Sequence, residues 1–272
     1  MRRIEKPWGR MHLGLGFVDV PADCAPVGEI RFGDVGDEDD ALLVKYLFTG
    51  GKLSVQVHPD DEAARAHGFP SGKDEAWYVV AAEPYAAIGM GLRDVMDRNA
   101  LTEAVCDGSI EDRLCWRAVK PGDFFYSPAG TVHAIGAGLT LVEVQQNVDL
   151  TYRLYDYERP RELHVVEGIA ASDPVPYVTS FVPVDVAPGR RLLANGPAFV
   201  LEQWRGERRV HVDGSVRPLW IVPVHGAIRI DGQEATVGEV WRSDGRTLLD
   251  LGSSSELLLA CPGEGALSVE PR

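Results

Sequence analysis

Short strand-like runs follow one another along the whole of this 272-residue chain, and this succession constrains the fold most. Glycine and proline, 29 and 18 residues, are spread between the runs and mark turns. The earlier runs are 41–48, 52–58, 75–82, 85–92, 122–128, 139–146 and 151–157. Later runs are "AFVLEQWRG", "PLWIVPVHGAIRIDG", "GEVWRSD" and "ELLLACPG". The pattern predicts an all-β sandwich or barrel.

Helical patterns are few. Residues 59–69 fit a short helix that begins near Asp60 or Asp61 and ends near Gly68. Residues 93–114 fit one or two further helices. We therefore expect a β fold with a few short helices attached to it.

The β runs group into two units. The segment 171–189 is rich in proline, small and β-branched residues, which predicts an extended crossing and not a disordered linker. Residues 118–136 and 228–252 share a weak pattern, a glycine followed closely by an aromatic residue at a turn into a strand. This internal match predicts a duplicated jelly roll.

The run "KLSVQVHPDD" (52–61) raises a question about its polar side chains. Because side chains alternate along a strand, Ser54, Gln56 and His58 share one face, opposite Leu53, Val55 and Val57. A solvated sheet face would explain these polar residues, and so would a site inside a barrel.

Two more ligand-type residues lie on separate strand-like runs. Glu75 opens the run 75–82, and His133 follows the turn-framed segment "PGDFFYSPAGTV". Together with Gln56 and His58 they offer nitrogen and oxygen ligands that suit zinc, manganese, iron or cobalt. We expect a catalytic metal site with open positions. The remaining histidines have no such framing and are interpreted as structural or solvent-exposed: His12, His67, His164, His211 and His225.

Charge and composition exclude some functions. The net charge of −14 argues against a general binder of nucleic acid or anionic lipid, so an anionic ligand would have to meet a few local cations. No run approaches the length of a membrane span, and the first residues lack the apolar region of a secretory signal. The four cysteines form no CxxC pair. We expect a cytoplasmic protein with reduced thiols.

Several motifs together resemble class I mannose-6-phosphate isomerases of the cupin superfamily. They are "KPWGR", "GEI", "LSVQVHPDDEAA", "GKDEAWYVV" and "SPAGTVHAIGAGLTLVEVQQNVDLTYRLYDYERPRELHV", in the family's order over about residues 6–168. The resemblance implies a catalytic cupin unit over 1–172 with the metal site. It implies a second, smaller cupin-like unit over 173–272 without metal ligands.

The resemblance also implies roles for individual residues. Zinc would be held by Gln56, His58, Glu75 and His133, the four residues that the strand pattern indicates. The activity implied is the interconversion of mannose 6-phosphate and fructose 6-phosphate through a cis-enediol. The pocket residues implied are Lys73 for proton transfer or phosphate contact, Arg153 on the opposite wall, Asp149 four residues before it, and Ser54 beside the substrate. Asp149, Glu75 or a metal-bound water are rival proton carriers, and the sequence does not choose among them. Further candidates for phosphate contact are Lys120, Arg159 and Arg161.

Two departures from the family pattern stand out. Arg31 replaces the family's usual tryptophan, and Val148 replaces a small polar residue. Arg31 is remote in sequence from the metal and proton-transfer candidates, whereas Val148 adjoins Asp149 and bears on substrate fit. Neither change removes a ligand.

Two other functions share much of this pattern. Another metal-dependent cupin enzyme, such as an iron dioxygenase or a sugar epimerase, would use the same ligands without needing Lys73 and Arg153. A non-catalytic sugar-phosphate-binding cupin would bind without turnover.

Overall fold

A computed structural model of the protein describes residues 1–36, 40–179, 181–267 and 269–271. Its contacts divide the chain into two compact units. Unit 1 comprises Met1–His12 and Val20–Thr179, and unit 2 comprises Leu13–Asp19 and Ser180–Arg272. The bounds expected from sequence, 1–172 and 173–272, remain a prediction.

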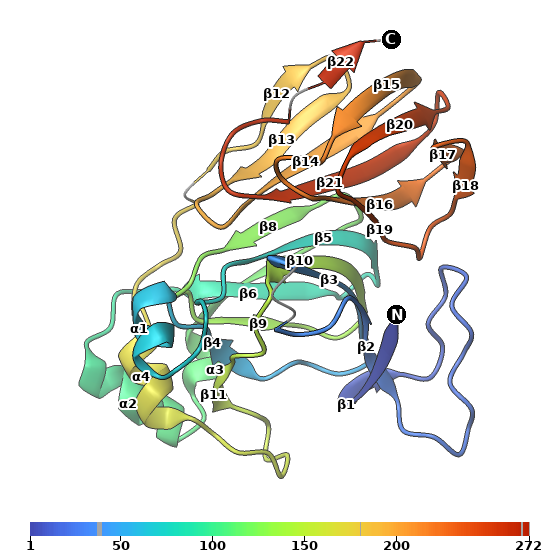
Figure 1. Ribbon diagram of the computed structural model, residues 1–272. Coiled ribbons are helices and arrows are strands. Elements are labelled where there is room, and N and C mark those ends of the chain that lie inside the picture. Colours follow the sequence, from blue (N-terminus) through green and yellow to red (C-terminus); the bar gives the residue numbers. More distant parts are fainter. Residues whose placement is uncertain (37–39, 180, 268, 272) are drawn as a thin grey trace. The chain divides into compact units, whose positions relative to one another are not determined.

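Unit 1 is a jelly roll of two antiparallel sheets (Figure 1). The six-stranded sheet has the order β1 (Arg2–Arg10), β2 (Val27–Phe32), β3 (Leu42–Thr49), β10 (Leu139–Gln146), β5 (Glu75–Ala82) and β8 (Phe124–Ser127). The five-stranded sheet has the order β11 (Tyr152–Tyr155), β4 (Val55–Val57), β9 (His133–Ile135), β6 (Ala87–Leu92) and β7 (Leu114–Ala118).

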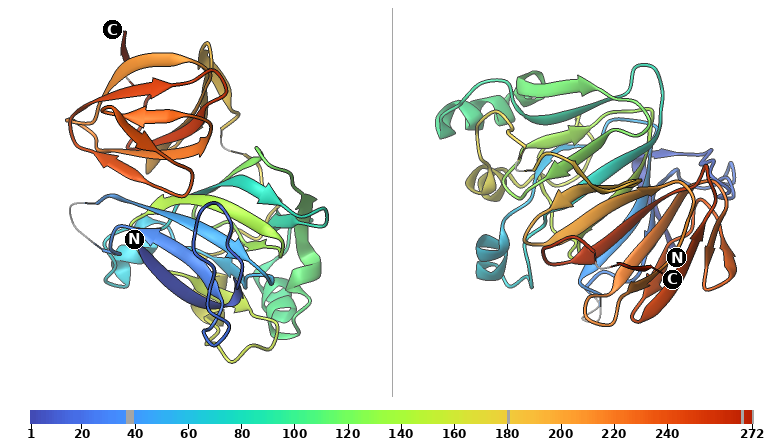
Figure 2. Two further views of the ribbon diagram at one scale, coloured as in Figure 1. Left: turned by 90° about the vertical axis from the view of Figure 1, so that its right-hand side faces the viewer. Right: turned by 90° about the horizontal axis from the view of Figure 1, so that it is seen from above.

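Unit 2 repeats this topology strand for strand. Figure 2 shows its strands in gold to red. Its six-stranded sheet has the order β12 (Val184–Ala187), β13 (Arg190–Asn195), β14 (Phe199–Arg205), β21 (Glu256–Pro262), β16 (Leu219–His225) and β19 (Trp241–Ser243). Its five-stranded sheet has the order β18 (Gln233–Ala235), β17 (Ile228–Ile230), β20 (Arg246–Leu251), β15 (Arg208–Asp213) and β22 (Val269–Pro271). Each strand corresponds to the unit 1 strand numbered eleven lower. The predicted all-β, duplicated jelly roll is confirmed.

The interior of unit 1 changes from apolar to polar along its strands. On β10 the side chains of Leu139, Leu141, Glu143 and Gln145 share one face by the alternation of the strand. Leu139 and Leu141 pack in an apolar cluster with Trp77 and its neighbours. Glu143 and Gln145 are also buried, but they bond to Lys45. One end of the jelly roll is therefore a hydrophobic floor, and the other is lined by polar groups.

The strand predicted over 52–58 is shorter in the structure, because ladder pairing begins at Val55. Val55 and Val57 join one apolar cluster, as the alternation predicts, but Leu53 joins the other cluster with Trp8. The placement of Leu53 with these valines was therefore wrong. Residues outside a ladder do not follow its period of two.

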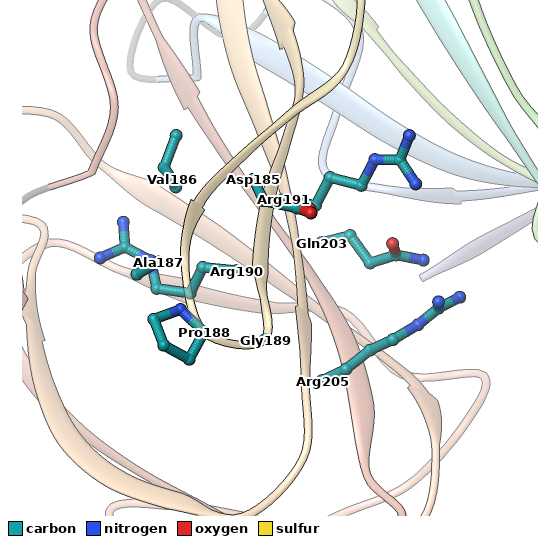
Figure 3. A pocket seen from close by; sticks show the side chains of 9 residues that line it. All are labelled: Asp185, Val186, Ala187, Pro188, Gly189, Arg190, Arg191, Gln203 and Arg205. Carbon is teal, nitrogen blue, oxygen red and sulfur yellow. The ribbon is translucent and has the colours of Figure 1, made fainter.

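Unit 2 has a mainly apolar interior. Its core is filled by side chains such as Val212, Ile221, Leu249 and Leu251, and its buried carboxylate, Glu202, is paired with Arg190. A groove beside the β12–β13 hairpin carries arginines, and Figure 3 shows Arg191, Gln203 and Arg205 extending to the same side. Two of the groove arginines form ion pairs within unit 2: Arg190 pairs with Glu202, and Arg205 pairs with Glu256.

Four short helices belong to the described part of unit 1, and none of them is both long and apolar enough to cross a membrane. They are α1 (Asp61–Ala66), α2 (Arg98–Cys106), α3 (Ile110–Arg113) and α4 (Val165–Ala171). The first three fall where the sequence predicts helices, and the Asp60 side chain caps α1 by accepting from the Ala63 amide.

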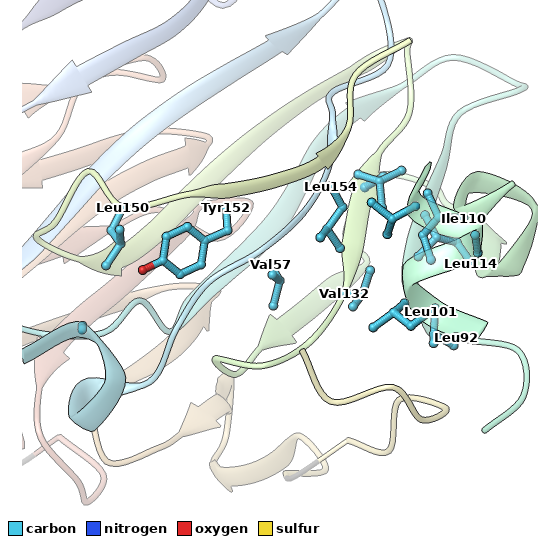
Figure 4. Packing of buried hydrophobic residues seen from close by; sticks show 14 of the residues in the cluster. Val57, Leu92, Leu101, Ile110, Leu114, Val132, Leu150, Tyr152 and Leu154 are labelled. Atoms are coloured by element: carbon cyan, nitrogen blue, oxygen red, sulfur yellow. The ribbon is translucent and has the colours of Figure 1, made fainter. Parts of the chain in front are cut away.

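The helix α4 was not predicted, because no side chain caps its first residue, which removes the usual start signal. It packs closely on β11: a Cβ at Gly168 would lie 2.5 Å from Leu154 Cδ2. Figure 4 shows Leu101 of α2 and Ile110 of α3 in the same apolar cluster as Leu154. The helices are thus held by burial against the sheet and not by their own propensity.

We expect the hydrophobic floor to carry much of the stability of unit 1. Leu141→Ala should lower the free energy of unfolding by about 2–5 kcal/mol, because Leu141 is 0% exposed and its loss leaves a cavity. Val95→Ala is the control, and it should change stability by no more than about 0.5 kcal/mol, since Val95 is 74% exposed. Urea unfolding of both variants would measure the difference. Equal losses would contradict this view of the core.

Candidate metal centre

Three ligand-type side chains meet at the polar end of unit 1. His58 follows β4, Glu75 opens β5 and His133 opens β9. One ligand atom from each lies within 4.8 Å of the others, and their exposed fractions are 1%, 0% and 1%. The meeting follows from strand pairing, because Gln56 of β4 lies opposite His133 of β9. In the part of the chain that the structure describes, this is the one such cluster.

Both imidazoles are held in the form that can bind a metal. His58 Nδ1 lies 2.8 Å from the Leu150 carbonyl oxygen, and His133 Nδ1 lies 2.9 Å from the Thr131 carbonyl oxygen. A carbonyl oxygen can only accept, so each Nδ1 carries the proton and donates it. Each Nε2 therefore presents a lone pair toward the centre, where it lies 3.2 Å (His58) or 3.1 Å (His133) from Glu75 Oε1.

One oxygen of the carboxylate between the imidazoles lacks a donor. Glu75 Oε1 is buried and has no hydrogen-bond partner in the described residues. It faces the lone pairs of His58 and His133, which have donors of their own in Lys73 and Gln56. A buried, unpaired carboxylate oxygen beside two lone pairs is stabilised by a positive charge placed between the three atoms. Two imidazole nitrogens and a carboxylate oxygen fit a divalent cation such as zinc.

The charge states at pH 7 agree with this interpretation. Burial and the charge of Lys73 lower the pKa of His58 to about 4, so its imidazole is neutral. Burial by itself raises the pKa of Glu75, but the charge of Lys73 at 2.7 Å holds it well below its ordinary value. The carboxylate is therefore ionised and the imidazole is neutral, as metal ligands must be.

Gln56 lies beside the cluster with its amide nitrogen inward. Its Nε2 is 3.1 Å from His133 Nε2, and its Oε1 accepts a hydrogen bond from Ser54 Oγ at 3.0 Å. Binding a metal through Oε1 requires a half-turn of this amide. The Ser54 hydroxyl can then accept from Nε2 instead of donating to Oε1, so the two side chains stay bonded after the half-turn.

Lys73 contacts two of the three cluster residues. Its Nζ lies 2.7 Å from Glu75 Oε2 and 3.1 Å from His58 Nε2, and the side chain is buried. The ammonium group of Lys73 thereby neutralises Glu75 Oε2 and leaves Glu75 Oε1 to face the two histidines. Lys73 also lines the neighbouring pocket, so it stands between the cluster and the pocket.

The pocket beside the cluster is rich in cations. Its lining has six cationic side chains against three carboxylates, although the whole chain carries a net charge of −14. The cations are Lys6, Arg31, Lys45, Lys73, Arg153 and Arg161, and the carboxylates are Glu29, Glu143 and Asp149. All four pocket residues expected from the sequence line it: Ser54, Lys73, Asp149 and Arg153. The local excess of positive charge suits an anionic ligand.

Of the three further candidates for phosphate contact, one lines the pocket and two do not. Arg161 lines the pocket and makes two bonds of 2.6 Å to Asp156. Arg159 is engaged by Asp156 and the Lys52 carbonyl oxygen and is not among the lining residues. Lys120 is exposed, pairs with Asp123, and does not line the pocket.

Arg153 and Asp149 differ in whether their charges are paired. Arg153 lies opposite Gln56 in the β4–β11 ladder, and its guanidinium makes no ion pair with any residue that the structure describes. Asp149 bonds to Arg31 at 3.3 Å with a side chain that is 61% exposed. Burial raises the pKa of Asp149, but the charges of Arg31, Lys45 and Lys6 hold it below its ordinary value.

Arg31 is one of the pocket residues that sequence reasoning missed, as are Lys6 and Lys45. It is remote from the site in sequence, yet it lines the pocket and bonds Glu29 at 2.8 Å and Asp149 at 3.3 Å. Its distance along the chain therefore did not reveal that Arg31 lies beside Asp149, one of the proton-transfer candidates. A signal existed: Glu29 and Arg31 are two residues apart on one strand and so share a face.

Comparison with known proteins places the chain in a family. Mannose-6-phosphate isomerase ManA of Bacillus subtilis is 44% identical over 145 residues, which cover 51% of this chain and 46% of that protein. A mannose-6-phosphate isomerase of Streptococcus mutans is 33% identical over 194 residues, 68% of this chain and 59% of that protein. YvyI of Bacillus subtilis, assigned to the same family, is 32% identical over 213 residues, 74% of this chain and 67% of that protein.

The chain belongs to the mannose-6-phosphate isomerase family. It matches only about half of the length of the first two relatives, 46% and 59%. No family model matches the sequence. The fold agrees, because a solved mannose 6-phosphate isomerase from Bacillus subtilis superposes with a TM-score of 0.78 at 23% identity, over 95% of this chain and 97% of that one. The expected cupin-type fold is confirmed.

The geometry predicts that this family member binds one divalent cation per chain. His133→Ala should weaken Zn²⁺ binding by more than about 100-fold, because it removes a direct ligand. Loss of a residue that only supports a ligand costs about 10–100-fold. His67→Ala is the matched control, since His67 is exposed and bonds only the Ala63 carbonyl oxygen. Competition with a chromophoric chelator would measure both affinities. Equal affinities in the two variants would contradict the site.

Proposed function

We propose that the chain interconverts mannose 6-phosphate and fructose 6-phosphate, with zinc held by Gln56, His58, Glu75 and His133. The observation that carries the proposal is the buried cluster of His58, Glu75 and His133 beside a cation-rich pocket in a member of this family. The same observation supports unit 1 as the catalytic unit. The described part of unit 2 has no comparable cluster.

The charge of the pocket supports a sugar phosphate as substrate. A phosphate ester carries close to two negative charges at neutral pH, which a chain of net charge −14 would repel unless cations lie locally. Three pocket cations in excess over carboxylates provide that attraction. Arg153 has an uncommitted guanidinium, whose planar donors match phosphate or enediolate oxygens.

The reaction moves a proton between C1 and C2 of the open-chain sugar. When bound, zinc would supply Lewis-acid stabilisation of the negative charge that develops on the sugar oxygens. We assign the proton transfer to Nζ of Lys73, which lies between the cluster and the pocket. The neutral amine is the form that accepts a proton, and a cation bound in the cluster would favour it over the ammonium form that pairs with Glu75. Asp149 is the weaker candidate, because a carboxylate whose pKa is held down by Arg31 accepts a proton less readily. Ser54, whose hydroxyl bonds Gln56 and lines the pocket, would contact the substrate.

Turnover tests the proposed reaction directly. Zinc-loaded wild type should convert mannose 6-phosphate to fructose 6-phosphate in a coupled assay, and chelation should abolish the activity. His133→Ala should lower kcat by at least about a hundredfold, because several kcal/mol of charge stabilisation are lost. His67→Ala should retain full activity. If the metal-loaded wild type turns over no substrate, the isomerase proposal fails, and binding without turnover would then indicate a sugar-phosphate-binding protein.

The two proton-carrier candidates can be separated by substitution. Lys73→Met should lower kcat by about 10²–10⁴-fold, the usual contribution of general acid–base catalysis. Asp149→Asn should lower it by less than about tenfold, because the Asp149 carboxylate is bound to Arg31. Metal content is measured in both variants, so that a lost ion is not mistaken for a lost base. The reverse order of effects would transfer the role to Asp149.

A further inference from the structure

The loop between α1 and β5 carries Lys73 and ends at Glu75, and its first part is fastened to the turn that follows His58. The Gly72 amide donates to Asp61 Oδ1 at 2.8 Å, and the Lys73 amide donates to the Pro59 carbonyl oxygen at 3.1 Å. The loop therefore moves only together with the segment that holds the first histidine of the cluster.

The contact at Gly72 leaves no spare room. A Cβ at this position would lie 2.4 Å from the backbone carbon of Asp60, closer than real contacts allow. Asp61 Oδ1 also accepts from Gln146 Nε2 at 3.1 Å. One carboxylate oxygen thus joins the loop to the end of β10, and the loop has a fixed position.

Asp74 forms the second fastening of the loop. Its amide donates to Gln146 Oε1 at 2.8 Å, and its carbonyl oxygen accepts from the Gln146 amide at 3.1 Å. Its carboxylate accepts from the Tyr126 hydroxyl at 2.5 Å and from the Ala129 amide at 2.9 Å. Tyr126 is buried at 6% exposure, so this is a charge-assisted bond in a dry environment.

The direction of the Tyr126 bond is settled by its chemistry. Burial and the neighbouring charge of Asp74 both raise the pKa of the Tyr126 phenol, so the hydroxyl keeps its proton and donates. The donor side chain comes from β8, and the Ala129 amide from the turn that leads toward His133. Asp74 therefore connects its loop to the segment that carries the second histidine of the cluster.

We propose that Asp74 is a positioning residue: held by Tyr126 and Ala129 on one side of the chain, it fixes Lys73 and Glu75 toward the metal centre on the other. The contacts divide the three residues in this way: Lys73 and Glu75 pair with each other and approach His58, whereas the Asp74 carboxylate bonds Tyr126 and Ala129. Anchoring the middle residue therefore restricts the positions that both neighbours can take. The inference rests on the proposed metal site. It adds a residue that neither binds the ion nor touches the substrate.

Two small changes test this role through metal affinity in the absence of substrate. Tyr126→Phe removes only the hydroxyl, and Asp74→Asn removes the charge with almost no change of shape. Each should weaken Zn²⁺ binding by about tenfold, in the range seen for partners outside the direct ligands. The affinity is measured by chelator competition well below the unfolding temperature, where a lower stability alone would not change it.

Tyr177→Phe is the matched control. It also removes a tyrosine hydroxyl from a hydrogen bond of 2.6 Å, to the Tyr126 carbonyl oxygen, and leaves both bonds of the Asp74 carboxylate intact. Zn²⁺ affinity in this variant should equal that of the wild type. Wild-type affinity in all three variants would overturn the positioning role while leaving the metal site standing. Failure of the wild type to bind Zn²⁺ would overturn the site and the role together.

Hydrogen exchange provides a second readout that needs no metal. Exchange of the amides of Gly72, Lys73 and Asp74 should accelerate at least about tenfold in Tyr126→Phe, because the loop loses one of its fastenings. The same amides should keep their wild-type rates in Tyr177→Phe. Unchanged exchange in Tyr126→Phe would show that the Tyr126 bond does not hold the loop, and the proposal would fail.

Discussion

The buried charge of Glu75 is the constraint on which the surrounding structure depends. A carboxylate at 0% exposure costs several kcal/mol unless positive charge compensates it. Lys73 compensates one oxygen at 2.7 Å, and the lone pairs of two histidines leave the other oxygen facing a position suited to a cation. The polar end of unit 1 satisfies this requirement, and the hydrophobic floor beneath it provides the stability that the polar end lacks.

Much of the centre could be predicted from the sequence because its signals are local. The alternation of Ser54, Gln56 and His58 against apolar neighbours marks a polar inner face, and the start of α1 is marked by the Asp60 cap. Glu75 opens a strand and His133 follows a segment with proline and glycine turn signals, so a few neighbouring residues sufficed to mark both as candidate ligands. The resemblance to the family added Lys73, Arg153 and Asp149, which no periodicity indicates.

The remainder depends on contacts between segments far apart in the chain, which alternation cannot reveal. Tyr126 and Asp74 are 52 residues apart, and Arg31 and Asp149 are 118 apart. The pairing of Arg31 with Lys45, and of Lys45 with Glu143, is set by the register of three strands. Leu53 was misplaced for the related reason that its backbone lies just outside the ladder. The alternation along a strand predicts which side chains share a face, but the pairing register of the strands decides which side chains of neighbouring strands lie together.

The two units have matching strand orders but different interiors. One arrangement of eleven strands encloses a charged, ligand-bearing cluster in unit 1 and a mainly apolar interior in unit 2. The same strand order is therefore compatible with either interior, and a handful of inward side chains decides which one a unit has. A chain with two such units can confine the buried charges, which cost stability, to one of them. The interior of the other unit can then be filled almost entirely by apolar packing.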